Sequence, residues 1–82
     1  MAVNYEKLIK DLVQPLVMNP EDLMVKKFSE DGDMLTLQII VNQEDLGRVI
    51  GKNGRIANAI RTIAYASASR EGKKVTINID SF

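Results

Sequence analysis

The residues of this chain best suited to bind a charged ligand stand together in a short stretch near its middle. Gly51 and Gly54 frame Lys52 and Asn53, and Arg55 follows at once. Lysine and arginine attract anions, the asparagine amide donates and accepts hydrogen bonds, and glycine has no Cβ to hold another backbone away. This combination predicts a loop that holds a phosphate-bearing chain: the glycines admit its backbone, and the polar side chains bind it.

Helical patterns stand on both sides of this loop. Residues 43–50 predict a short helix, with Gly51 where a C-terminal cap belongs. Residues 54–70 predict a longer helix, and the spacing of its isoleucines places Ile60 and Ile63 in the core. The first amides of a helix have no internal partner, so a phosphate near the start of the longer helix would meet free N–H groups. Three apolar neighbours are expected to support the loop and to line the floor of a groove: Val49, Ile50 and Ile56.

The remaining segments predict one helix and three strands. Residues 4–18 carry the apolar stripe of an amphipathic helix, with Asn4 as its N-cap and Pro15 as a kink or end. Alternating apolar residues predict further elements, and each strand has one apolar face. The expected α+β arrangement is one sheet packed against all three helices. The predicted strands are residues 23–29, 34–41 and 74–80, the first two joined as a hairpin through the Asp-Gly turn at 30–33.

The glycine loop between two helices resembles the GxxG loop of the KH domain, a module that clamps a single-stranded nucleic-acid backbone. The likeness extends over residues 1–82 as a single domain and points to the small bacterial single-KH-domain RNA-binding proteins of the KhpA type. It implies a type II KH fold of order α-β-β-α-(GxxG)-α-β, whose three-stranded mixed sheet carries three helices on one face. It also implies single-stranded RNA as partner and a role in RNA regulation or as an RNA chaperone. RNA rather than single-stranded DNA rests on this resemblance alone. The RNA-binding residues it predicts are Gly51, Lys52, Asn53, Gly54, Arg55, Arg48, Val49 and Ile50.

Charge is distributed unevenly although the formal net charge is zero. Residues 1–47 hold nine acidic and four basic side chains, whereas residues 48–74 hold seven basic ones against Glu71 alone. The cationic part begins beside the glycine loop, which favours an anion-binding surface there. The turn at residues 29–33 is short and acidic, and in the KH arrangement it lies beside the binding groove. Acidic side chains beside the groove would repel a nucleic-acid backbone, so we expect a single domain to bind weakly.

An enzyme is not expected from this composition. The chain has no cysteine or histidine, so it lacks thiolate ligands and the commonest general base, and no cofactor or metal site is predicted. Gly54 is followed by Arg55 and Ile56, which does not fit the G-K-[ST] ending of a P-loop. No apolar run reaches the ~20 residues of a membrane span and no signal-peptide pattern opens the chain. We therefore expect a cytoplasmic protein without a membrane partner.

Other interpretations of the same residues remain open at this stage. The glycines would also suit a tight helix–helix connection, and the KH scaffold would also suit a protein–protein interaction module with little RNA binding. Arg48 is placed to bind a phosphate or to pair with Glu44. The more distant cations, Arg61, Arg70, Lys73 and Lys74, fit ordinary surface positions better than phosphate-binding ones, and Arg61 is the strongest candidate among them. Tyr65 fits a core-edge position better than a base-stacking one.

The resemblance also allows self-association, or a heterodimer with a larger KH protein of the Jag type. Small side chains between residues 64 and 69 would let another helix approach the long helix. The same small residues would equally fit that helix against its own sheet, and this second reading is slightly favoured.

Overall fold

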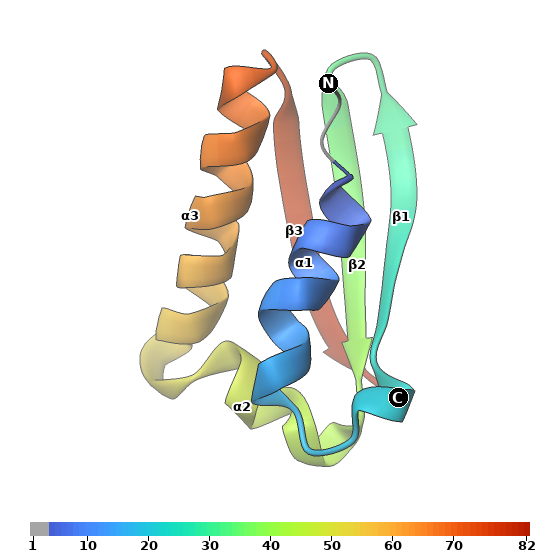
Figure 1. Cartoon of the computed structure of the whole chain (residues 1–82), viewed down its shortest axis with the longest axis vertical. Coiled ribbons are helices and arrows are strands. Elements are labelled where there is room, and N and C mark those ends of the chain that lie inside the picture. The colour runs from blue at the N-terminus through green and yellow to red at the C-terminus, as the bar shows by residue number, and fades with distance from the viewer. Residues whose placement is uncertain (1–3) are drawn as a thin grey trace.

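The computed structural model describes residues 4–82, so residues 1–3 of the predicted domain lie outside it. Helices α1, α2 and α3 lie on one side of a three-stranded sheet, as Figure 1 shows. The strand order is β1-β2-β3, with β1 antiparallel and β3 parallel to the central β2. This confirms the predicted α+β, type II KH-like arrangement with a mixed sheet.

Helix α1 (Tyr5–Val13) begins and ends where its sequence dictates. The Asn4 side chain accepts a hydrogen bond from the Lys7 backbone N–H at 3.0 Å, which confirms the predicted N-cap. The α-helix stops at Val13, and a 3₁₀ turn with Pro15 at its centre follows over Gln14–Leu16. The helix is therefore shorter than the predicted 4–18, because proline has no N–H to continue the ladder.

The hairpin joins β1 (Met24–Asp31) and β2 (Met34–Val41) through a turn in which Gly32 has a φ of 60°. Strand β1 extends two residues further into the turn than predicted, whereas β2 has its predicted bounds, and the register shifts between Lys27 and Ser29. Phe28 lies in this bulge with 71% of its surface exposed. Strand β3 (Lys74–Ser81) then pairs along the whole of β2, from Met34 opposite Lys74 to Val41 opposite Ser81.

The core lies between the inner face of the sheet and the three helices. Alternate residues of β2 are buried, and those of β3 follow the same period. Helix α3 (Arg55–Arg70) contributes mostly alanines, so its backbone lies close to the sheet. The buried residues are Tyr5, Ile9, Val13, Leu23, Leu35, Leu37, Ile39, Val41, Val49, Ala57, Ile60, Ala64, Ala68, Val75 and Ile77, together with Asp45.

Two predictions about α3 have different outcomes. Ile60 is buried as expected, but Ile63 is 43% exposed, so its predicted core position is wrong. The side of the helix that faces the sheet is centred on Ile60 and Ala64, and Ile63 lies on its flank. Ala64 and Ala68 are buried within their own domain, which supports the reading in which small residues serve the internal packing. Among residues 4–82, no helix is long and apolar enough to cross a membrane.

Candidate nucleic-acid interface

The glycine loop connects α2 (Leu46–Ile50) to α3 through a single tight turn. Gly51 ends α2 with φ 75° and ψ 172°, and its N–H donates to the Gly47 carbonyl at 2.8 Å. A 3₁₀ turn over Lys52–Gly54 follows, within which Asn53 has left-handed angles of φ 58° and ψ 27°. Gly54 is also left-handed, with φ 74° and ψ 14°, and α3 begins at the next residue. Two successive left-handed residues therefore turn the chain sharply between the helices.

The two glycines are needed for different reasons. A Cβ at Gly51 would lie 2.7 Å from Cγ1 of Ile56, so this glycine lets the loop close on its own isoleucine. A Cβ at Gly54 would meet only the Asn58 amide nitrogen, at 3.9 Å. The expectation that both glycines clear space for a docked backbone is thus corrected at Gly51, where the space is filled from within. At Gly54 the positive φ is the constraint, and the outside of the loop stays open.

The backbone donors of the loop are also arranged differently from the prediction. The Gly54 N–H donates to the Gly51 carbonyl at 3.1 Å, and the Arg55 N–H donates to the Lys52 carbonyl. The first amide of α3, that of Arg55, is thus occupied within the turn, as is the amide of Gly54 before it. The exposed polar groups that remain at the tip of the loop are the side chains of Lys52 and Asn53.

The predicted binding residues separate into an exposed and a supporting group. Lys52, Asn53, Arg55 and Arg48 are exposed, and none of them forms a salt bridge within residues 4–82. Arg48 therefore does not pair with Glu44, which settles one open alternative. Val49 is completely buried and offers no surface to a ligand. Ile50, Ile56 and the two glycines are half-buried, and Ile56 packs against the core.

Asp45 fixes the position of α2, and the sequence did not reveal this role. Its carboxylate is fully buried and accepts hydrogen bonds from the backbone N–H groups of Met18 and Asn19, at 2.9 and 3.0 Å. The Asn19 side-chain amide donates a third at 3.2 Å. Burial alone would raise the pKa of Asp45, but these donors and the nearby Arg48 charge lower it below its ordinary value. Its partners lie 26 and 27 residues away in the sequence, so no local pattern indicates them.

Arg61 was the strongest phosphate-binding candidate among the more distant cations, and part of its guanidinium is hydrogen-bonded within the domain. Its Nε and Nη2 atoms donate to the Ile77 carbonyl oxygen at 3.3 and 3.2 Å. This contact joins α3 to β3. No local sequence signal reveals it, because the acceptor is a backbone atom on another element.

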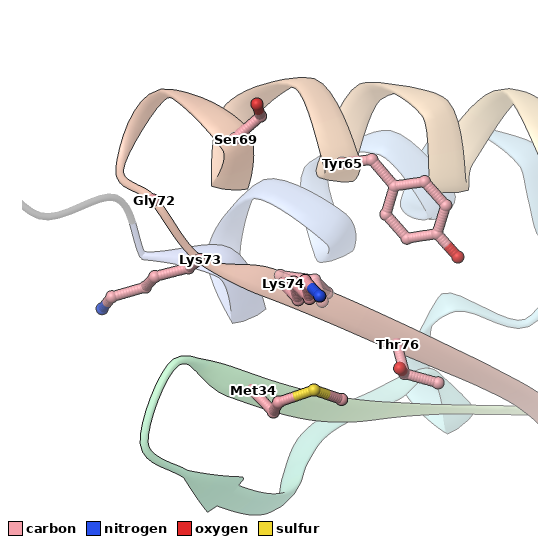
Figure 2. A pocket seen from close by; sticks show the side chains of 8 residues that line it. Met34, Tyr65, Ser69, Gly72, Lys73, Lys74 and Thr76 are labelled. Carbon is pink, nitrogen blue, oxygen red and sulfur yellow. The ribbon is translucent and has the colours of Figure 1, made fainter.

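Beyond Arg61, a pocket of about 540 Å³ opens between the last turns of α3 and the start of β3. Figure 2 shows the Tyr65 ring extending from the helix toward the strand, with Thr76 and Met34 on the opposite wall. Tyr65 is 46% exposed, so its ring is open to solvent beside the pocket. Lys74 brings a cation to the pocket, while Lys73 lies 3.9 Å from the Glu71 carboxylate.

The mixed sheet, its three helices and the GxxG turn define a KH-like domain of type II. The family model described as "KhpA/KhpB, KH domain" matches residues 6–79. The chain is 49% identical over 74 residues to the RNA-binding protein KhpA of Listeria monocytogenes serovar 1/2a, covering 90% of this chain and 96% of that protein. It is 42% identical to the proteins of the same name from Clostridium perfringens and Bacillus subtilis, again over 74 residues and 90% of this chain. These matches cover 97% and 90% of the two relatives. The chain therefore belongs to the KhpA/KhpB KH-domain family.

Solved structures show the same fold within a larger protein. Aquifex aeolicus Era superposes with a TM-score of 0.70 at 21% identity, over 95% of this chain and 30% of the Era chain. Era solved in complex with part of 16S ribosomal RNA gives a TM-score of 0.64 at 23% identity, over 94% and 29% of the two chains. The chain thus spans about a third of the length of Era.

Proposed function

We propose that this protein is a non-enzymatic RNA-binding protein that holds single-stranded RNA at the loop Gly51–Gly54. The observation that carries the proposal is the open tip of this loop. Lys52 and Asn53 present an ammonium and a side-chain amide at the exposed tip, with Arg48 and Arg55 on either side. Relatives that match over most of their length are named RNA-binding proteins, which supports RNA as the nucleic acid.

The arrangement suits a phosphodiester backbone better than a carboxylate ligand or a small metabolite. The exposed cations follow one another along the loop and the helices beside it, so they can contact successive phosphates of a chain that passes over it. Contacts to phosphates carry no sequence information, so we assign this loop to the backbone of the RNA and not to its bases. We infer general single-strand binding by this element, in the cytoplasm, in the service of RNA regulation or as an RNA chaperone.

The experiment that tests this is fluorescence anisotropy of a labelled single-stranded RNA pool, titrated with wild type and with a Lys52→Asp/Asn53→Asp variant. We expect the variant to bind at least about tenfold more weakly, since a hydrogen bond to a charged group contributes roughly 1.5–3 kcal/mol. A Lys10→Asp/Gln14→Glu variant makes the same change of charge on the exposed face of α1 and just beyond it. It should bind nearly as wild type does. Equal loss in both variants would mean that net charge alone governs binding, and the loop assignment would then fail.

Salt dependence gives a second readout of the same contact. With two or three phosphates engaged, the slope of log K against log salt concentration should be about −1.4 to −2.1. Weak affinity of this kind favours pairing of domains, since a second linked site raises avidity.

A second candidate function is that of a protein–protein interaction module. The exposed Ile63, on the flank of α3 where a core residue was expected, favours it. We propose this flank as a contact for self-association or for a heterodimer with a larger Jag-type KH protein. Sedimentation equilibrium of wild type and Ile63→Asp tests it: the substitution should shift a dimer toward monomer, and RNA binding that survives in the monomer would separate the two functions.

A further inference from the structure

Arg61 lies on α3 between the glycine loop and the Tyr65 pocket, and one edge of its guanidinium is hydrogen-bonded to the sheet. Two of its N–H groups, on Nε and Nη2, converge on the Ile77 carbonyl oxygen. Arg61 is half-buried, while the Ile77 side chain points into the core. The guanidinium is therefore held in one orientation by the strand.

The Ile77 carbonyl belongs to the open edge of the sheet. Strand β3 is the outer strand, and its even-numbered residues bond toward β2, as Lys74 N–H to Asp33 O at 2.8 Å and Phe82 N–H to Val41 O at 3.1 Å show. Backbone groups alternate in direction along a strand, so those of Val75, Ile77 and Ile79 point away from β2. Arg61 thus occupies the middle of an edge that carries free backbone donors and acceptors on both sides of it.

The remaining donors of Arg61 face no protein acceptor. A guanidinium carries five N–H groups in a fixed planar fork. Nε–H and one N–H of Nη2 donate to Ile77. The second N–H of Nη2 and the adjacent N–H of Nη1 are parallel and form the other edge of the guanidinium. No hydrogen bond or ion pair within residues 4–82 uses it. The anchored side chain offers two parallel donors, which match a partner with two adjacent acceptors.

We propose that Arg61 is a specificity-determining residue that selects cytosine or guanine at one position of the bound RNA. Guanine presents O6 and N7 as adjacent acceptors, and an unpaired cytosine presents O2 and N3. Adenine places a donor next to each ring acceptor on its Watson–Crick and Hoogsteen edges, and uracil has an N–H between its two carbonyls. Neither satisfies both arms of the fork. The guanidinium anchored by Ile77 cannot turn to suit another base without losing its hydrogen bonds to the strand.

The position of Arg61 suits this role, which rests on the proposed RNA binding at the loop. Arg61 lies seven positions after Gly54, which corresponds to a rise of about 10 Å along the helix. An RNA strand held at the loop therefore reaches Arg61 within a few nucleotides. Tyr65 follows one turn later with an exposed ring, where a neighbouring base can stack (Figure 2). The competing explanation is that Arg61 only caps the free edge against pairing with another strand.

The test measures base preference rather than affinity alone. Each competitor is an octauridine in which one position carries cytidine, guanosine or adenosine, and all eight positions are tested in turn. The competitors displace a labelled octauridine from the wild-type protein. We expect one position at which cytidine or guanosine improves binding about fivefold or more over uridine and adenosine, the low end for a bidentate contact. Arg61→Lys keeps the charge and removes the fork, so the preference should fall below about twofold. Arg70→Lys is the matched control, an exposed arginine in the last turn of the same helix, and should keep the preference.

Three outcomes would overturn the proposal. Wild type that binds in a loop-dependent way without any preference for cytidine or guanosine refutes it and leaves the proposed function standing. An unchanged preference in a folded Arg61→Lys variant reduces Arg61 to an edge cap. Absence of binding by wild type, or binding indifferent to Lys52→Asp/Asn53→Asp, removes the proposed function and this inference together. The Arg61 side-chain N–H resonances in wild type provide a readout without mutation: they should shift with the preferred octamer and stay in place with octauridine.

Discussion

The two sharpest turns of this domain use the same backbone device and opposite charges. The β1–β2 turn and the GxxG turn both depend on glycines with positive φ, and Figure 1 places them at opposite ends of the molecule. Gly32 stands among acids, and at this end Lys27 pairs with Glu30 at 3.1 Å. Lys52 stands among cations and pairs with no carboxylate in the described part of the chain. A net charge of zero therefore hides a domain whose two sharp turns carry charges of opposite sign.

The comparison also shows two ways of stabilising a turn. The hairpin turn is held by the ladder on each side of it, and a Cβ at Gly32 would meet nothing within 4 Å. The GxxG turn has no ladder. It depends on the contact between Gly51 and Ile56 and on the carboxylate of Asp45 that fixes the helix before it. The exposed GxxG turn is thus held in place by contacts that lie beneath it.

The largest effect that separates the turns is expected from alanine at Gly51. An alanine at this position would keep a positive φ, and its Cβ would lie 2.7 Å from Cγ1 of Ile56. We therefore expect the free energy of unfolding to fall by about 2–4 kcal/mol. Gly32→Ala has only the cost of the positive φ, because its Cβ would meet no atom within 4 Å, and should lower the free energy of unfolding by about 1–2 kcal/mol. Gly47→Ala is the control, because Gly47 is helical with an open Cβ direction, and it should stabilise by up to about 1 kcal/mol. Urea unfolding of the three variants checks the order, and equal losses at Gly51 and Gly32 would contradict the packing argument.

The next effect is expected at Asp45, the anchor that the hairpin turn lacks. Asp45→Asn leaves an amide against two backbone N–H donors, and we expect the melting temperature at pH 7 to fall by roughly 5–10 °C. The pKa of Asp45 is lowered in the folded protein, so its ionised form adds stability above its unfolded pKa of about 4. This contribution is lost as the pH falls through the folded pKa. Melting curves of wild type and variant should therefore converge in acid; a constant gap down to pH 2 would show that the charge does not matter.

The smallest effect is expected from the acidic turn. Asp31→Asn/Asp33→Asn removes two exposed charges at the end of the molecule opposite the GxxG turn, and the affinity for RNA should rise by about twofold at low salt. The gain should vanish near 0.5 M salt, where the screening length is only a few ångströms. Anisotropy titrations at both salt concentrations measure it. A gain that persists at high salt would indicate direct contact between this turn and the RNA.

Local sequence patterns predicted the elements of this fold because each helix and strand carries its own period. The stripe of α1 and the alternation in β2 and β3 could be read directly, and the GxxG turn was identified from its two glycines and cations. The strand order could not be obtained in this way, since nothing local distinguishes a parallel from an antiparallel β3. It followed from the resemblance to KH domains.

The features that sequence reasoning missed are long-range contacts of single side chains. Asp45 was placed correctly at a helix start, but its acceptor role depends on Met18 and Asn19, which only the fold brings near. Ile63 has helical spacing to Ile56 and Ile60, yet α3 packs by its alanines and turns this isoleucine outward. Arg61 looked like one more surface cation until its carbonyl partner on β3 was known.

The parallel pairing of β3 with β2 has a consequence for the order in which the domain is assembled. Strands β1 and β2 are neighbours in the chain and can pair early, whereas β3 must wait until α2, the glycine turn and α3 have formed the crossover between them. The glycine turn lies inside that crossover, and the Arg61 contact needs β3 itself. During synthesis, therefore, we expect this domain to remain incomplete until β3 has left the ribosome. The emergence of β3, and not that of the glycine turn, would then set the moment at which the fold is complete.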